Sequence, residues 1–131
     1  MRGPIANLLD DLPPAGSDEV FEPLLERPGV RLERIVSSGQ STPPDAWYDQ
    51  EQDEWVMIVA GAARLCIEGQ GVFDMKAGDS VFLPAHCRHR VEWTDPRQQT
   101  VWLALHLWNE ARASGPAAAV QGAASGGNPG D

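Results

Sequence analysis

Two residues of this chain, Glu54 and His89, combine a chemically active side chain with a place at the start of a predicted strand. Side chains alternate along a β-strand, so Glu54, Val56 and Ile58 would share one face of a strand that begins at Glu54. A carboxylate among apolar residues is costly unless it is paired, protonated or bound to a cation. If this face is buried, Glu54 is a candidate for acid–base chemistry or for metal binding.

The residues around this pair follow two spaced patterns. Gly61 follows Glu54 after six residues, and Gly78 comes seventeen residues after that glycine. These patterns resemble the two motifs of the cupin superfamily, which are Glu-x6-Gly at the end of the first motif and Gly-x5-Pro-x-Gly-x2-His in the second. The second motif is matched by Gly78, Pro84 and His89, with His86 in place of its second glycine.

The resemblance covers about residues 40–108 and implies both a fold and a site. The implied fold is all-β, a single antiparallel barrel of the cupin type, which is a double-stranded β-helix or jelly roll. The resemblance also implies that Glu54 and His89 face the lumen of the barrel from neighbouring strands. These two residues are therefore the catalytic candidates, and together they would form half of a metal site.

The other ligand positions are where this sequence departs from the family. Cupins that bind metal usually carry His-x-His three or four residues before the glutamate. Those positions hold Tyr48 and Gln50 here, or Trp47 and Asp49 with the longer spacing. The resemblance thus implies a divalent metal (Mn, Fe, Ni or Zn) as a candidate cofactor, whose ligands would come from Glu54, His89, His86, Asp49 and Gln50.

A pocket for a small molecule is the second expectation. Trp47 and Tyr48 come shortly before the apolar run and could form an apolar lid over a ligand. Arg64 and Arg88 could pair with a carboxylate of a substrate. The residues predicted to line the pocket are Trp47, Tyr48, Val56, Ile58, Arg88 and His106.

Each candidate also has a purely structural interpretation. Glu54 could hydrogen-bond Tyr48 or another polar neighbour. His86 could cap its own turn, and His106 could simply pack on a strand face. Cys87 lies among basic and titratable neighbours that could lower the pKa of its thiol, but no second feature supports catalysis by this cysteine.

Three functions remain open at this stage. The first is a metal-dependent enzyme that acts on a small molecule. The second is a metal-free binding or sensory module, and the third is a metal-free isomerase or lyase that uses Glu54 and His89 as an acid–base pair. The sequence does not decide whether the protein is an enzyme.

Short runs of β-forming residues separated by Gly and Pro predict the elements that position the site. An edge strand is expected near residues 20–25. We expect an N-terminal arm over residues 1–19, a barrel over 20–112 and an Ala- and Gly-rich tail without fixed structure over 113–131. The other predicted strands lie near residues 30–36, 54–60, 63–68, 72–75, 80–84, 89–94 and 100–108.

Composition narrows the partners. The chain has 131 residues with 10 Lys and Arg against 19 Asp and Glu, a net charge of −9 that disfavours nucleic acid. No apolar run approaches the roughly 20 residues of a membrane span, and no signal-peptide core follows Met1, so we expect a cytoplasmic protein. Outward-facing Trp55 and Trp102, together with an edge strand, predict a homodimer.

Overall fold

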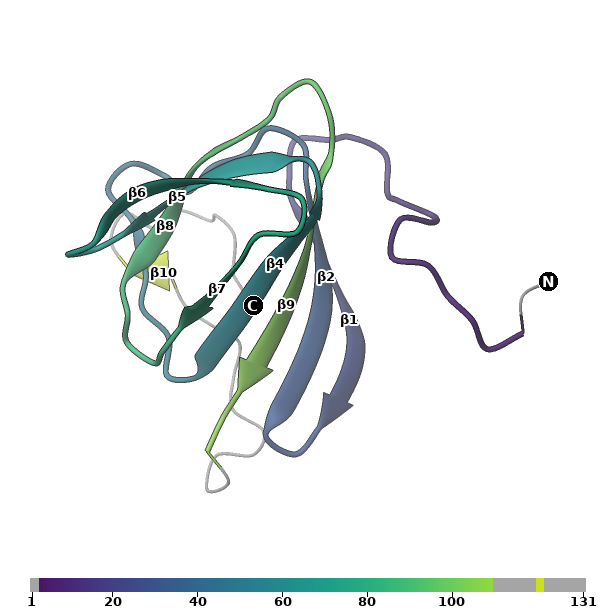
Figure 1. Ribbon diagram of the computed structural model, residues 1–131, viewed down its shortest axis with the longest axis horizontal. Coiled ribbons are helices and arrows are strands. Elements are labelled where there is room, and N and C mark those ends of the chain that lie inside the picture. The colour runs from purple at the N-terminus through teal and green to yellow at the C-terminus, as the bar shows by residue number, and fades with distance from the viewer. Residues whose placement is uncertain (1–2, 110–119, 122–131) are drawn as a thin grey trace.

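Ten β-strands and no helix form the part of the chain that the computed structural model describes, residues 3–109 and 120–121 (Figure 1). No described helix is therefore long and apolar enough to cross a membrane. The strands are β1 (Val20–Arg27), β2 (Val30–Ser37), β3 (Trp47–Tyr48), β4 (Asp53–Ala60), β5 (Ala62–Ile67), β6 (Gly71–Lys76), β7 (Ser80–Leu83), β8 (His89–Thr94), β9 (Thr100–Leu107) and β10 (Val120–Gln121).

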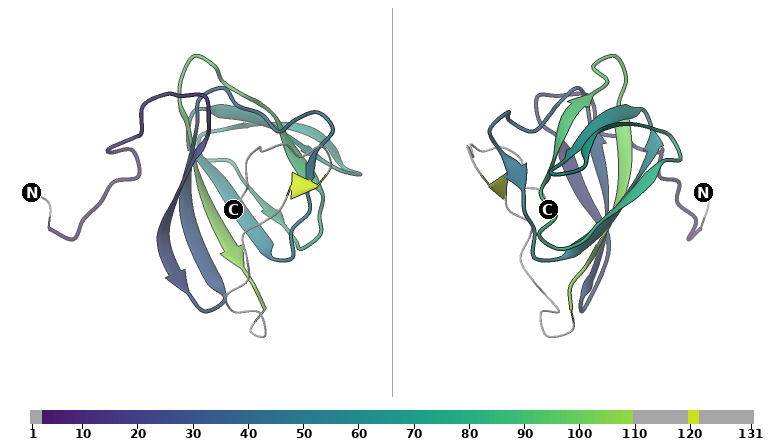
Figure 2. Two further views of the ribbon diagram at one scale, coloured as in Figure 1. Left: turned by 180° about the vertical axis from the view of Figure 1, so that it is seen from behind. Right: turned by 60° about the vertical axis from the view of Figure 1, so that its left-hand side comes forward.

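These strands form two antiparallel sheets that curve around a shared interior (Figure 2). The first sheet has the order β1-β2-β9-β4-β7 and the second has the order β10-β3-β8-β5-β6. The expected all-β antiparallel barrel is confirmed. The strands β3 and β10 were not predicted, because an element of two residues is too short to show a periodic pattern.

Burial along β4 shows why this sequence forms a barrel wall. Glu54, Val56 and Ile58 are buried, while Trp55 and Met57 on the alternate face are half-buried. The face that carries Glu54 is therefore the inner face of the barrel. The core around it is built mainly from aliphatic residues of both sheets, among them Ile35, Val56, Ile58, Leu65, Ile67 and Leu83.

The prediction that Trp102 faces outward is wrong. Trp102 is only 4% exposed, and its partners in the neighbouring strands are the core residues Ile35 and Ile58. Strand β9 is apolar at almost every position, so alternation in the sequence does not tell its two faces apart. Trp55 does lie on the outer face, opposite the exposed Phe82 of β7.

Gly61 ends the first motif because the turn from β4 to β5 passes close to another strand. The φ angle of Gly61 is +96°, and a Cβ at this position would lie 2.6 Å from the Thr100 Cα. Any other residue would be strained and would clash with the Thr100 backbone. The glycine thus lets β9 lie directly against the end of β4.

Arg34 is one of several barrel residues that hold the N-terminal arm in place. The guanidinium of Arg34 on β2 donates hydrogen bonds to the carbonyl oxygens of Leu8 and Asp10 at 2.9 and 2.8 Å. The predicted tail lies outside the described residues except for β10, which pairs with β3. The division into arm, barrel and tail stays a prediction.

Candidate functional site

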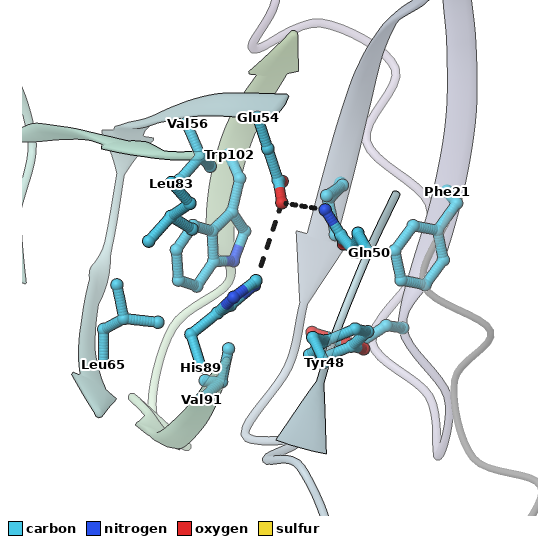
Figure 3. A pocket seen from close by; sticks show the side chains of 12 residues that line it. Phe21, Tyr48, Gln50, Glu54, Val56, Leu65, Leu83, His89, Val91 and Trp102 are labelled. Atoms are coloured by element: carbon cyan, nitrogen blue, oxygen red, sulfur yellow. Dashed lines mark hydrogen bonds and ion pairs between the residues drawn. The ribbon is translucent and has the colours of Figure 1, made fainter. Parts of the chain in front are cut away.

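A pocket with a cavity volume of about 60 Å³ lies between the two sheets (Figure 3). Its apolar lining comes from Phe21, Ile35, Val56, Leu65, Leu83 and Val91. Its polar and aromatic lining comes from Glu19, Tyr48, Gln50, Glu54, His89 and Trp102. An apolar cavity with a few convergent polar groups is the usual form of a small-molecule site.

Glu54 is the polar centre of this pocket. The side-chain amide of Gln50 donates a hydrogen bond to Glu54 Oε1 at 3.1 Å, and His89 Nε2 lies 3.8 Å from the same oxygen. Glu54 and His89 are both buried, and their side chains point toward each other in Figure 3. The structure thus brings together three of the five predicted metal ligands: Glu54, His89 and Gln50.

The ring of His89 is held in a defined orientation. His89 Nδ1 lies 2.9 Å from the carbonyl oxygen of Cys87, which can only accept, so Nδ1 carries the proton of the neutral ring. The Tyr48 ring stacks on the face of the His89 ring, with the ring centroids 5.4 Å apart and the ring planes at 17° to each other. Nε2 therefore faces Glu54 and the pocket.

Strand pairing explains why these side chains meet. Tyr48 of β3 is the direct cross-strand partner of His89 in β8, which places their rings side by side. Glu54 of β4 is the partner of Leu83 in β7, on the opposite sheet from His89. The pocket is the space that these two sheets enclose.

Glu19 is a pocket residue that the sequence analysis missed. Its carboxylate accepts a hydrogen bond from the Ser37 hydroxyl, and Ser37 Oγ in turn accepts one from Trp102 Nε1 at 3.0 Å. Burial raises the pKa of Glu19, and the hydrogen bond from Ser37 partly offsets this rise. Because Glu19 and Phe21 are two residues apart, strand alternation continued back from β1 would have placed both on the inner face.

Other predicted ligands lie away from the pocket lining. His86 Nδ1 lies 2.8 Å from Asp49 Oδ1, and the His86 side chain is 67% exposed. Its φ angle of +63° is the left-handed conformation that a glycine adopts easily, which explains the glycine of the second motif at this position. Trp47 also lies outside the lining, with the Arg88 and Arg90 guanidinium groups over its ring.

Two further predicted pocket residues belong to the barrel interior. Ile58 is fully buried in the hydrophobic core. His106 is also fully buried: its Nε2 lies 2.9 Å from Glu33 Oε2, and its Nδ1 lies 3.1 Å from the side-chain amide of Gln52. Neither residue lines the pocket.

Cys87 is not activated by its basic neighbours. Burial raises the pKa of its thiol, and the negative charge of Glu68 raises it further. A thiol with a raised pKa is a poor nucleophile at neutral pH. The structure therefore gives Cys87 no catalytic role.

The donor atoms of the pocket fit a metal ion only in part. His89 Nε2 and the Glu54 carboxylate are strong ligands, and Gln50 contributes a weaker amide. A protein site for a first-row divalent metal usually supplies at least three ligands. The described residues contain no group of three His, Cys, Asp or Glu side chains that could hold one. Glu54, His89 and Gln50 would therefore hold a metal ion only with further ligands from outside these residues.

Comparison with known proteins identifies the family. The family model for the cupin domain matches residues 33–106, and the chain belongs to this family. This match agrees with the two sequence motifs and with the barrel of two antiparallel sheets. No curated protein matches the chain.

Solved structures share the fold. A candidate mannose-6-phosphate isomerase from Ralstonia eutropha JMP134 is 52% identical, with a TM-score of 0.77, over 80% of this chain and 98% of that one. A cupin superfamily protein from Desulfitobacterium hafniense DCB-2 is 17% identical, with a TM-score of 0.63, over 75% and 84% of the two chains. The DMSP lyase DddQ from Ruegeria pomeroyi DSS-3 is 20% identical, with a TM-score of 0.58, over 71% and 43%.

Proposed function

We propose that this cupin binds a small molecule in the barrel pocket and that Glu54 and His89 make the main polar contacts to it. One observation supports this most strongly: two ionisable side chains, each 6% exposed, converge in a pocket with apolar walls. Glu54 accepts a hydrogen bond from Gln50, and His89 directs Nε2 toward the pocket while Nδ1 contacts the Cys87 carbonyl. Polar groups arranged in this way fix the orientation of a bound molecule.

The same pair could also transfer protons. A carboxylate and an imidazole that contact one ligand can act as base and acid, which would suit a metal-free isomerase or lyase. The name of the Ralstonia relative is consistent with an isomerase. A phosphorylated sugar is less well supported, because no lysine or arginine among the described residues lines the pocket, and these side chains usually bind phosphate.

Binding of a divalent metal by Glu54 and His89 is another candidate function, and the orientation of the His89 ring favours it. The test is metal analysis of protein purified without a histidine tag and then reconstituted with Mn, Fe, Ni or Zn. Stoichiometric metal that is lost in Glu54→Ala and His89→Ala, but kept in Trp47→Ala, would support this candidate. Absence of metal after reconstitution would remove it.

Binding in the pocket can be tested by filling it. Val56→Trp would place a large side chain in the lining, whereas Val72→Trp makes the same change on exposed β6. The measurement is ligand-observed NMR with a mixture of small neutral, cationic and anionic compounds. We expect compounds that bind the wild type and Val72→Trp to lose binding in Val56→Trp. Equal binding to all three proteins would contradict the proposal.

We also propose that two copies of the chain associate. The outer face of the first sheet carries Trp55, Leu105 and the 53% exposed Phe82, which are neighbours in the pairing of β9, β4 and β7. A second copy would cover this apolar face. Sedimentation should show a dimer that Phe82→Glu converts to a monomer, and a monomeric wild type would contradict the idea. A cytoplasmic location also remains a proposal.

A further inference from the structure

The charges of the pocket indicate which class of ligand it accepts. Glu19 and Glu54 bring two carboxyl groups to the lining, and His89 brings one imidazole. No lysine or arginine among the described residues joins them there. With both carboxyls ionised, the lining is negative even when His89 is protonated. The chain as a whole carries a net charge of −9, which also attracts cations and repels anions.

The two carboxyl groups lie on opposite sides of an apolar surface. Glu19 directly precedes β1, and Glu54 lies on β4, with β2 and β9 between these strands in the sheet. From those two intervening strands, Ile35 and Trp102 contribute to the lining. A ligand that contacts both carboxyl groups must therefore also lie against apolar and aromatic atoms.

The aromatic rings of the pocket, like its carboxyl groups, favour a positively charged ligand. Phe21, Tyr48 and Trp102 all line the pocket, and Figure 3 shows their rings around the space that Glu54 faces. The faces of such rings attract ammonium groups, and this attraction grows when water is excluded. An inorganic cation would gain little from the apolar walls. An organic cation gains from both the carboxylates and the rings.

We infer that the ligand of the proposed binding pocket is a small organic cation and that Glu19 is the residue that selects its positive charge. This inference rests on the proposed function and adds a substrate class to it. Glu19 suits this role because Ser37 holds its carboxyl group in place at one side of the apolar surface, while Glu54 lies at the other side. The chain of hydrogen bonds from Trp102 through Ser37 to Glu19 also links the aromatic wall to the carboxyl group.

The test uses three probes of nearly equal shape and different charge. These are choline, its uncharged carbon isostere 3,3-dimethylbutan-1-ol, and the anion 3,3-dimethylbutanoate. Calorimetric titrations in the presence of EDTA would exclude any contribution from a bound metal. We expect choline to bind at least about tenfold more tightly than the alcohol, and the anion to bind most weakly. Equal affinity for choline and the alcohol, or tighter binding of the anion, would overturn the inference.

Glu19→Gln tests the selecting residue, because glutamine keeps the shape and still accepts the Ser37 hydrogen bond. We expect this variant to lose about tenfold in choline affinity while its affinity for the alcohol stays the same. Glu68→Gln is the matched control, since it removes one negative charge from an exposed residue outside the lining. An unchanged ratio of choline to alcohol affinity in Glu19→Gln would contradict the role of Glu19.

The outcomes separate this inference from the proposed function. Binding of only neutral or anionic compounds, blocked by Val56→Trp, would overturn the cation inference and support the binding pocket. If no compound of any charge binds, both fail.

Discussion

Two glutamate–histidine pairs lie inside the same barrel, and they differ in what surrounds them. Glu54 Oε1 and His89 Nε2 are 3.8 Å apart in the pocket. Glu33 Oε2 and His106 Nε2 are 2.9 Å apart, and neither side chain is exposed at all. The residue types are identical, so the difference between the pairs comes from their neighbours.

The neighbours occupy both ring nitrogens of one histidine and leave one ring nitrogen of the other facing the pocket. Both ring nitrogens of His106 have protein partners, and Arg31 Nη2 lies 3.4 Å from the second oxygen of Glu33. His89 uses one ring nitrogen for the Cys87 carbonyl and presents the other to the pocket. A pair that is fully enclosed by protein stabilises one structure, whereas a pair beside a cavity can bind a ligand.

The largest expected effect distinguishes the pairs by stability. His106→Ala should lower the free energy of unfolding by about 3–5 kcal/mol, because it breaks a fully buried pair and leaves Glu33 Oε2 without its hydrogen-bond partner. His89→Ala should cost clearly less, since Glu54 keeps its bond from Gln50 and faces a pocket. Urea denaturation measures both values. Equal losses in the two variants would break the comparison.

Glu19 should make stability depend on pH. Burial raises its pKa above the ordinary value of 4.5, so the folded protein holds this proton more tightly than the unfolded chain does. The resulting stabilisation is fully present below 4.5 and is lost as the pH rises through the raised pKa. The wild type should therefore lose stability relative to Glu19→Gln on going from acidic to neutral pH. Denaturation curves at several pH values would test this, and a constant difference would contradict it.

The smallest effect concerns the third histidine, which belongs to neither pair. His86 adopts a left-handed backbone with φ of +63°, and its side chain is largely exposed. We expect His86→Gly to keep or slightly raise the stability and His86→Val to lower it by about 1–2 kcal/mol. Thermal unfolding of both variants measures this. A stable His86→Val together with a destabilised His86→Gly would show that the side chain, rather than the backbone, matters there.

Much of the fold could be predicted from local patterns. The apolar runs between Gly and Pro give β1, β2 and β4 to β9, and alternation along β4 identifies the face of Glu54. Alternation failed for Trp102, because β9 is apolar on both faces. The predicted N-terminal arm includes residue 19, so the sequence does not assign Glu19 to the pocket.

Local sequence patterns could not predict which buried polar side chains contact one another. Glu33 and His106 are far apart in the sequence and meet only because β2 and β9 are neighbours in the sheet. The same is true of Ser37 and Trp102. Sheet order, rather than the spacing of residues, decides which histidine is enclosed by protein and which one faces the pocket.

The most direct test of the account follows the histidine rings themselves. Long-range ¹H–¹⁵N NMR spectra resolve the ring nitrogens of His89 and His106 during titration with choline and with 3,3-dimethylbutan-1-ol. The account predicts that at least one probe shifts the Nε2 resonance of His89 and leaves both nitrogens of His106 unchanged. If His89 shifts neither with these two probes nor with the anion 3,3-dimethylbutanoate, or if His106 shifts as much as His89, the assignment of the pocket as the binding site is contradicted.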